Sequence, residues 1–227
     1  LNTKLKIIDA VVDKIVPPQP PTSLNVIVET YGSIILDVST GLQPLKKSEI
    51  ISYKNYENEF YKKLWLLNGL HLQLAYYGLA NGHTFIHEVI ASKDGREFAK
   101  ATVNSLAEAY ALLSQSNENL DEFTNTIIDR FALPEIKDEV ARIARNPEIK
   151  FSKDERFEYP LRLLISHDKN VDTFRKILDI ITSGNYQQVE GYSNFKEDVL
   201  EKGKSHIYND FWELENYSKS YIERLGS

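Results

Sequence analysis

The sequence of 227 residues contains no cysteine and no methionine. Without cysteine the chain has neither disulfides nor thiolate metal ligands, which excludes every zinc site built on cysteine. The absence also fits the reducing environment of the cytoplasm, so we expect a cytosolic protein. Because methionine is missing even at position 1, we expect the sequence to be an excerpt of a longer chain or a processed product.

Three further absences narrow the class of protein. No segment approaches about 18 consecutive apolar residues, and residues 1–16 mix charged with apolar side chains, so neither a membrane helix nor a signal peptide is expected. The 27 basic and 33 acidic residues give a net charge of −6 without a long basic block, so we expect neither nucleic acid nor a membrane as partner. None of the 10 glycines forms a Gly-x-Gly sequence, so the dinucleotide-binding fingerprint is missing.

The residues that are present predict a mainly α-helical fold. A hydrophobic content of 42% is enough for a substantial core. After a proline-rich break at 17–21, residues 23–30 alternate in the manner of a strand, and 33–37 fit a second short strand or a helical turn. Helical patterns then occupy 56–80, 84–91, 94–115, 120–131, 137–145, 154–166, 171–183, 195–202 and 205–225. We expect one irregular multi-helix domain with a small β appendage near the N-terminus.

Three polar residues, Lys63, Asn68 and His71, interrupt the apolar segment KLWLLNGLH at 63–71. In an α-helix, at about 100° per residue, His71 lies roughly 80° and Asn68 roughly 140° from Lys63, so all three share one side. Apolar neighbours disfavour the charged form of a lysine and make it a usable general base. Asn68 can then donate to a developing alkoxide, and His71 can orient the base or the substrate hydroxyl. The alternative is structural, with the amide and imidazole bonded to backbone and the lysine extending to solvent.

Two other patterns favour a structural interpretation. His83 and His87 are four residues apart with Glu88 next, and could face one metal ion, but no third ligand is apparent and the segment also reads as the start of a helix. We therefore predict no metal site.

Aromatic residues near helical spacing predict a terminal helix that packs on the body of the domain. These residues are Tyr208, Phe211, Trp212, Tyr217 and Tyr221.

A basic run surrounds a turn at residues 146–147. Its members are Arg142, Arg145, Lys150 and Arg156. Arg142 and Arg145 lie three residues apart on one helix face and could hold an anion or a polyol. They could equally pair with acidic neighbours such as Asp138 on a solvated surface, and the pattern alone favours this second interpretation.

Several segments, taken in order, resemble the polyol-specific long-chain dehydrogenases. AVVDKIVPP at 10–18 resembles the AVDRIVPP of that family, and VIVET at 26–30 resembles its strand. KLWLLNGLH, followed by LAYYGLANGH at 74–83, resembles its Lys-x4-Asn-x2-His helix. DRFALPEIKDEVARIAR at 129–145 resembles its RF-x-NP-x-x-K-D-x-V-x-R-x-x-R. The resemblance covers about residues 7–160 and implies the C-terminal substrate domain of a 6-phosphogluconate-dehydrogenase-like architecture.

The resemblance also implies a reaction, the metal-independent interconversion of mannitol 1-phosphate and fructose 6-phosphate with NAD. Lys63 matches the general base that takes the hydroxyl proton while hydride leaves the same carbon. Asn68 matches the amide that stabilises the alkoxide, and His71 matches the third member of the helix motif. Asp13 matches an acidic residue expected to support the site.

The substrate contacts follow from the same resemblance. Arg142 and Lys150 match basic residues that bind substrate, and Arg145 is expected to contact the phosphate. The resemblance further implies that the main NAD-binding domain, a Rossmann domain N-terminal to this one, lies outside the sequence. The chain by itself is therefore not expected to turn over substrate.

Departures from the family pattern leave alternatives open. Asn68-Gly69-Leu70-His71 stands where the phosphate-specific branch reads Asn-Thr-Gly-His, and is closer to the mannitol 2-dehydrogenase and hexuronate-reductase branches. Basic residues of the phosphate branch are replaced by Ile149 and, further on, by Tyr159. One alternative is thus an enzyme for an unphosphorylated polyol or a sugar acid. The other is a helical domain that only binds a sugar phosphate or a protein.

Overall fold

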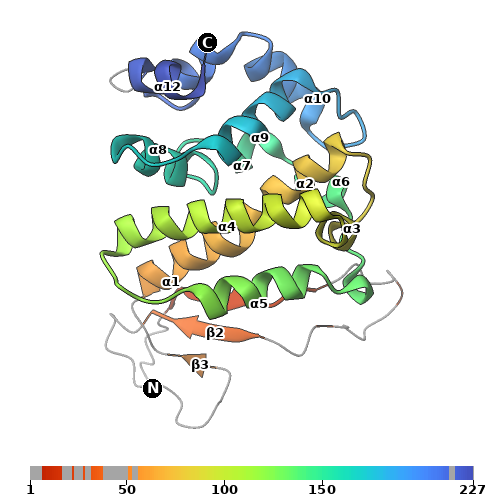
Figure 1. Cartoon of the computed structure of the whole chain (residues 1–227), viewed down its shortest axis with the longest axis vertical. Helices are drawn as coiled ribbons and strands as arrows, with labels where there is room; N and C mark the ends of the chain where they lie inside the picture. The colour runs from red at the N-terminus through yellow and green to blue at the C-terminus, as the bar shows by residue number, and fades with distance from the viewer. Residues whose placement is uncertain are drawn as a thin grey trace, which may run out of the picture. The chain divides into compact units, whose positions relative to one another are not determined.

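The computed structural model describes residues 7–16, 22, 28, 32–37, 51–52, 56–214 and 218–226 (Figure 1). The chain divides into two compact units, Leu1–Lys63 and Leu64–Ser227. The described residues are mostly helical, with one small sheet near the N-terminus, which confirms the predicted fold class.

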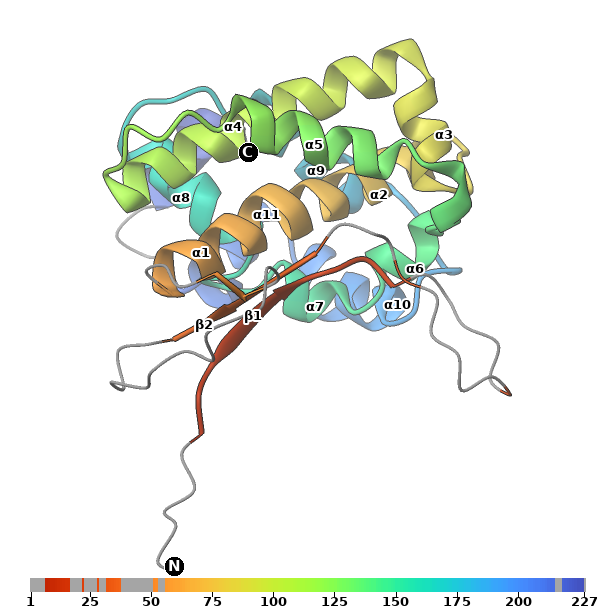
Figure 2. The same ribbon diagram turned by 90° about the horizontal axis from the view of Figure 1, so that it is seen from below.

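The first unit contains a three-stranded sheet and one helix. Strand β1 (Ala10–Asp13) runs antiparallel to β2 (Ser33–Leu36), as Figure 2 shows, and β2 pairs in parallel with β3 (Ile51–Ser52). Helix α1 (Tyr56–Lys62) packs against β1 and β2. In β1 the even positions are exposed and Val11 and Asp13 are buried, which is the alternation expected of a strand with one covered face.

The strand predictions are partly confirmed. Within the predicted segment 33–37, Ser33–Leu36 form a strand rather than a helical turn, and Ile35 in it is buried. The strand predicted at 23–30 lies, apart from Val28, outside the described residues. Strand β1 was not predicted, since its four residues carry no turn signal before them.

The second unit consists of helices. In order, with η1 beginning at the last residue of the first unit, they are η1 (Lys63–Gly69), α2 (Leu70–Ala80), α3 (Ile86–Ala91), α4 (Lys93–Ser114), α5 (Asp121–Phe131), η2 (Pro134–Ile136), α6 (Val140–Ala144), α7 (Pro147–Lys150), α8 (Glu158–Ser166), α9 (Asp172–Ser183), α10 (Tyr192–Phe195), η3 (Lys196–Leu200), α11 (Lys204–His206), η4 (Ile207–Phe211) and α12 (Ser218–Leu225).

Helix α2 is the centre of this unit. It is apolar around almost its whole circumference, and such a helix must be covered on all sides. It packs against α3, α4, α6 and α9, as can be followed in Figure 1. Leu70, Leu74 and Tyr76 are fully buried. Because α2 is fixed from several directions, side chains at its N-terminal end are held in defined positions.

The largest helix prediction that fails is the single helix at 205–225. The chain instead forms α11, η4 and α12, with Trp212 to Leu214 outside any helix. Trp212 is buried and donates from Nε1 to the carbonyl oxygen of Phe151 at 2.6 Å, and Glu213 adopts a left-handed φ of 51°. A left-handed residue cannot continue an α-helix, so the helix ends there. The predicted packing of the aromatic residues on the body of the domain is confirmed for Trp212, whose ring lies 6.3 Å from that of Phe157, and for Phe211, whose ring lies 5.6 Å from that of Phe195.

Two other helices are shorter than predicted. The segment 137–145 is helical only from Val140, because Lys137 has a left-handed φ of 47°. The segment 154–166 is helical only from Glu158, because Asp154 has a left-handed φ of 64°. The non-helical residues of both segments form loops that deliver polar side chains to the site described next.

Candidate active site

The segment that carries Lys63, Asn68 and His71 is helical, but it is not a regular α-helix. Residues Lys63–Gly69 form a π-helix between α1 and α2. A π-helix closes i→i+5 hydrogen bonds and has more residues per turn, so the angles calculated at about 100° per residue do not hold there. Such segments are rare and are found frequently at functional sites.

Lys63 and Asp13 lie in the first unit and are near each other in it. Lys63 Nζ donates a hydrogen bond to the carbonyl oxygen of Val12 in β1. Asp13, the next residue, is buried. The structure therefore joins the predicted base to the strand that carries the predicted supporting acid. The lowered basicity of Lys63 stays a prediction.

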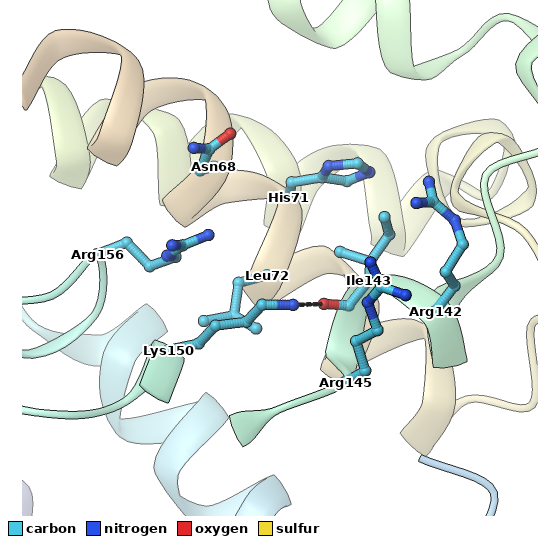
Figure 3. A pocket seen from close by; sticks show the side chains of 8 residues that line it. All are labelled: Asn68, His71, Leu72, Arg142, Ile143, Arg145, Lys150 and Arg156. Atoms are coloured by element: carbon cyan, nitrogen blue, oxygen red, sulfur yellow. Dashed lines mark hydrogen bonds between the residues drawn. The ribbon is translucent and has the colours of Figure 1, made fainter. Parts of the chain in front are cut away.

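The second unit has a pocket of about 120 Å³ at the N-terminal end of α2. The residues that line it, shown in Figure 3, are Asn68, His71, Leu72, Arg142, Ile143, Arg145, Lys150 and Arg156. The pocket brings together two of the three motif residues and all three predicted substrate-binding cations. It joins the helix motif to a basic run that is distant in sequence.

His71 is oriented by Asp138, a residue to which the sequence assigned no role in a site. His71 Nε2 lies 3.0 Å from Asp138 Oδ2, and Arg142 Nη2 donates to Asp138 Oδ1. The imidazole also stacks on Phe131, with ring centroids 4.4 Å apart. Burial raises the pKa of Asp138, but contact with His71 and the charge of Arg142 outweigh it, so the net pKa is lowered.

Asp138 is held by its backbone as well as by its side chain. It is only 5% exposed, and its carbonyl oxygen accepts from Ile86 N at 2.9 Å. The residue lies two positions before α6, and its carboxylate connects α6 to α2 through Arg142 and His71. Two signals pointed to it in the sequence, its spacing of four from Arg142 and its place in the Lys-Asp of the family motif.

Lys150 enters the pocket because the chain turns sharply after α6. Asn146 has a left-handed φ of 54°, and Pro147 begins α7. Lys150 Nζ donates to the carbonyl oxygen of Ile143 at 2.6 Å, the dashed line in Figure 3. Burial, followed by the charges of Arg156, Arg145 and Arg142 in that order, lowers the pKa of Lys150 to about 8. The pocket is therefore crowded with positive charge.

The remaining cations differ in exposure. Arg145, at the C-terminal end of α6, is exposed, and the described residues offer it no ion pair. The Arg156 side chain is 20% exposed, and its Nε lies 3.0 Å from Glu155 Oε2. The sequence placed Arg156 in the basic run but gave it no function.

The two substitutions that departed from the phosphate branch do not line this pocket. Ile149 is 62% exposed. Tyr159 packs edge-on against Trp65, with ring centroids 5.1 Å apart, and carries Arg162 over its face. The pocket obtains its positive charge without side chains from these two positions.

The histidine pair does not converge on one site. His83 lines a pocket with Tyr77 and Asn81, whereas His87 lines a different one beside Arg130. Glu88 Oε2 accepts from the backbone N–H groups of Thr84 and Phe85, as expected at a helix start. In the part of the chain that the structure describes, no three His, Asp or Glu side chains gather in a way that could hold a metal ion.

Comparison with known proteins identifies the family of this chain. Residues 54–194 match the model of the mannitol dehydrogenase C-terminal domain, and the chain belongs to that family. This is a class of helical domains from polyol dehydrogenases. Within it, the chain is 30% identical over 205 residues to the mannitol-1-phosphate 5-dehydrogenase of Mycoplasmopsis pulmonis, covering 89% of this chain and 54% of that protein. It is 34% identical over 149 residues to the Clostridium acetobutylicum enzyme of the same name, covering 63% and 37%.

Solved structures give the same fold. Mannitol 2-dehydrogenase of Pseudomonas fluorescens, in a ternary complex with NAD and D-mannitol, aligns with a TM-score of 0.77 at 17% identity, covering 96% of this chain and 50% of that one. A D-sorbitol dehydrogenase aligns with a TM-score of 0.61 at 15% identity, covering 96% and 53%. The chain thus spans about half the length of the proteins it matches. No helix among the described residues is long and apolar enough to cross a membrane.

Proposed function

We propose that this chain is the substrate domain of an NAD-dependent enzyme that interconverts mannitol 1-phosphate and fructose 6-phosphate in the cytoplasm. In this proposal a separate N-terminal Rossmann domain of the same protein supplies the main NAD site. The residues of this chain do not fit that role, because the sequence has no Gly-x-Gly and the described pocket is lined by cations rather than by a glycine-rich turn.

One observation carries the choice of substrate, namely the charge balance of the pocket. Arg142 is paired with Asp138, and Arg156 is paired with Glu155. Arg145 and Lys150 have no carboxylate partner among the described residues. Two positive charges therefore remain for a ligand, which matches a phosphate monoester of charge about −2 at neutral pH.

In the proposed chemistry, each of three residues of this chain has a separate role. Lys63 Nζ takes the proton of the substrate hydroxyl, and the Asn68 amide donates to the oxygen as it gains negative charge. His71, held by Asp138, orients that hydroxyl. NAD held mainly by the N-terminal domain would accept the hydride, so that the alcohol carbon would become the carbonyl carbon. Anchoring of the phosphate by the pocket cations fixes the substrate for the transfer.

The second candidate is a related enzyme for an unphosphorylated polyol or a sugar acid. Two observations favour it, the Asn68-Gly69-Leu70-His71 sequence and the structural similarity to a mannitol 2-dehydrogenase. A neutral polyol would leave both unpaired cations of the pocket without a counter-charge. A hexuronate would supply one negative charge and leave one cation uncompensated.

The test is the nicotinamide-linked rate of the complete protein with fructose 6-phosphate, fructose and fructuronate, followed by loss of NADH. We expect turnover of fructose 6-phosphate only. Faster turnover of either other sugar would keep the mechanism and replace the substrate, and no turnover of any of them would favour a domain that only binds.

Lys63→Ala in the same protein tests the base. We expect a loss of at least about 1,000-fold in kcat with the fold intact, because no other group is proposed to take the hydroxyl proton. Circular dichroism and the melting temperature report the fold. A near-normal rate in this variant would remove Lys63 from the mechanism.

A further inference from the structure

Arg156 approaches the pocket from a different segment than the other cations. Arg142 and Arg145 belong to the α6 end of the pocket, whereas Arg156 lies in the loop between α7 and α8. Figure 3 shows Arg156 on the side of Asn68 and Arg142 on the opposite side, with Lys150 between them. An anion in the pocket would be enclosed by positive charge from both sides.

The guanidinium of Arg156 is oriented by one hydrogen bond, and its two Nη atoms remain available to a ligand. Its Nε lies 3.0 Å from Glu155 Oε2, and the same carboxylate oxygen accepts from Arg156 N at 3.2 Å. Among the described residues nothing accepts from its two Nη atoms. Two parallel N–H donors on one planar group fit two oxygens of a phosphate, a geometry that lysine cannot reproduce. Glu155 thus sets the direction of the side chain and leaves its outer edge for a ligand.

The backbone at Arg156 is placed by a glycine in the catalytic motif. A Cβ added at Gly69 would lie 2.9 Å from the carbonyl oxygen of Arg156, closer than a real Cβ approaches backbone. The loop can therefore lie against η1 only where residue 69 has no side chain. Since Gly69 directly follows Asn68, this contact ties the position of Arg156 to that of the amide proposed to stabilise the alkoxide.

We propose that Arg156 is the residue by which this pocket selects a phosphorylated over an unphosphorylated sugar, and that Gly69 is the positioning residue that sets its distance from Asn68. The inference rests on the function proposed above and deepens it. It assigns the discrimination to one bidentate contact, while Arg145 and Lys150 supply charge that acts on any anion.

The test is a calorimetric titration of the protein with fructose 6-phosphate, fructose and inorganic phosphate, in the wild type and in Arg156→Gln, Arg156→Lys and Lys153→Gln. Lys153 is the matched control, because it lies in the same loop, carries the same charge and pairs with Glu213 away from the pocket. We expect Arg156→Gln to weaken binding of fructose 6-phosphate by about 10- to 100-fold, the range of a charged hydrogen-bonded pair. Arg156→Lys should recover only part of this, and Lys153→Gln should stay within about twofold.

The outcomes separate this inference from the function on which it rests. Equal losses in Arg156→Gln and Lys153→Gln would mean that only long-range charge matters, and no loss in Arg156→Gln would remove the residue from the site. Either result overturns the inference and leaves the proposed substrate standing. A wild-type protein that binds fructose but not fructose 6-phosphate would overturn both.

Gly69→Ala tests the positioning step separately. Alanine normally favours a helix, so a local effect alone would stabilise the protein. We expect instead a lower affinity for fructose 6-phosphate, with fructose binding retained, because the loop that carries Arg156 is displaced. An alanine variant that is more stable and binds fructose 6-phosphate as the wild type does would contradict the role of Gly69.

Discussion

Two clusters of charged residues lie within a few positions of each other in the sequence and differ in how their charge is balanced. We call Arg142, Arg145, Lys150 and Arg156 the pocket cluster, and Asp154, Glu158 and Arg162 the α8 cluster. In the α8 cluster one arginine has two carboxylate partners. In the pocket cluster four cations have only two carboxylate partners, Asp138 and Glu155, among the described residues.

The α8 cluster is built like part of the core. Glu158 is fully buried and accepts from Arg162 Nε and from Asp154 N, each at 2.8 Å, and Tyr221 OH lies 3.4 Å away. Arg162 also lies over the ring of Tyr159. Every charge there has a partner, as the buried carboxylate of Glu158 requires. Of these two clusters, only the pocket cluster has more cations than carboxylate partners, and such an excess is what a site for an anion needs.

Removing Glu158 from the α8 cluster, and Glu155, the partner of Arg156, from beside the pocket cluster, should have the largest effect and distinguishes the two clusters most directly. We expect Glu158→Ala to lower the free energy of unfolding by about 3–5 kcal/mol, because it leaves Arg162 with part of its charge uncompensated beside the core. Glu155→Ala, whose carboxylate is 28% exposed, should cost less than about 1 kcal/mol. Urea unfolding of both variants measures the difference, and equal losses would contradict the division into a structural and a ligand-binding cluster.

The second largest effect is expected from Asp138, which connects Arg142 of the pocket cluster to His71 of the helix motif. In Asp138→Asn, His71 loses its carboxylate and Arg142 loses its charge partner. We expect kcat/KM for fructose 6-phosphate to fall by about 10- to 100-fold, the value of hydrogen bonds to charged groups. Glu139→Gln, an exposed neighbour of the same charge, is the control.

A double-mutant cycle shows whether Asp138 acts through His71. If it does, adding His71→Asn to Asp138→Asn should cost far less than the sum of the two single changes. Additive losses would mean that Asp138 serves the fold instead. The melting temperature of each variant accompanies the kinetics, since a structural loss would appear there first.

How much of this could be read from the sequence depends on the range of the interaction. The regular helices follow from local periodicity, as in α4 and α9, whose polar and apolar faces are distinct. The grouping of Asn68 and His71 with Arg142 needed the family resemblance, because no local pattern links segments so far apart. The π-helix at 63–69 was missed, since its hydrogen-bond pattern has no apolar period of its own that differs clearly from that of a buried α-helix.

Asp138 and Arg156 were missed for a different reason. Both are charged residues within a run of charges, and the pattern alone assigns such residues to a solvated surface. What makes each a candidate site residue is a tertiary contact: the approach of Asp138 to His71, and of the Arg156 backbone to Gly69. Neither of these two distances can be inferred from the spacing of residues in the sequence. The same holds for the end of η4 before Trp212, where Glu213 takes a left-handed φ and Trp212 bonds to the carbonyl oxygen of Phe151.

The pH dependence of Lys150 gives the smallest effect and sharpens the comparison. The pKa of Lys150 is lowered to about 8 from 10.5, chiefly by burial and then by the three arginines of the pocket, against the weaker influence of Glu155. The lysine therefore loses its charge as the pH rises through about 8, while the phosphate monoester stays dianionic above about pH 6. We expect the affinity for fructose 6-phosphate to fall between pH 7 and pH 9 by up to about tenfold.

The stability of the empty protein should respond in the opposite direction. Between pH 8 and pH 10.5 the unfolded chain keeps a proton on Lys150 that the folded chain has lost, so the contribution of this residue to stability rises with pH in that window. In Lys150→Met, the pH dependence of the affinity and that of the stability should both disappear. At neutral pH this variant should be more stable than the wild type and bind fructose 6-phosphate more weakly. Calorimetric binding and thermal unfolding across pH 7 to 10 measure the pair. If the affinity falls with pH in Lys150→Met as it does in the wild type, another group titrates, and the excess charge of the pocket cluster does not reside on this lysine.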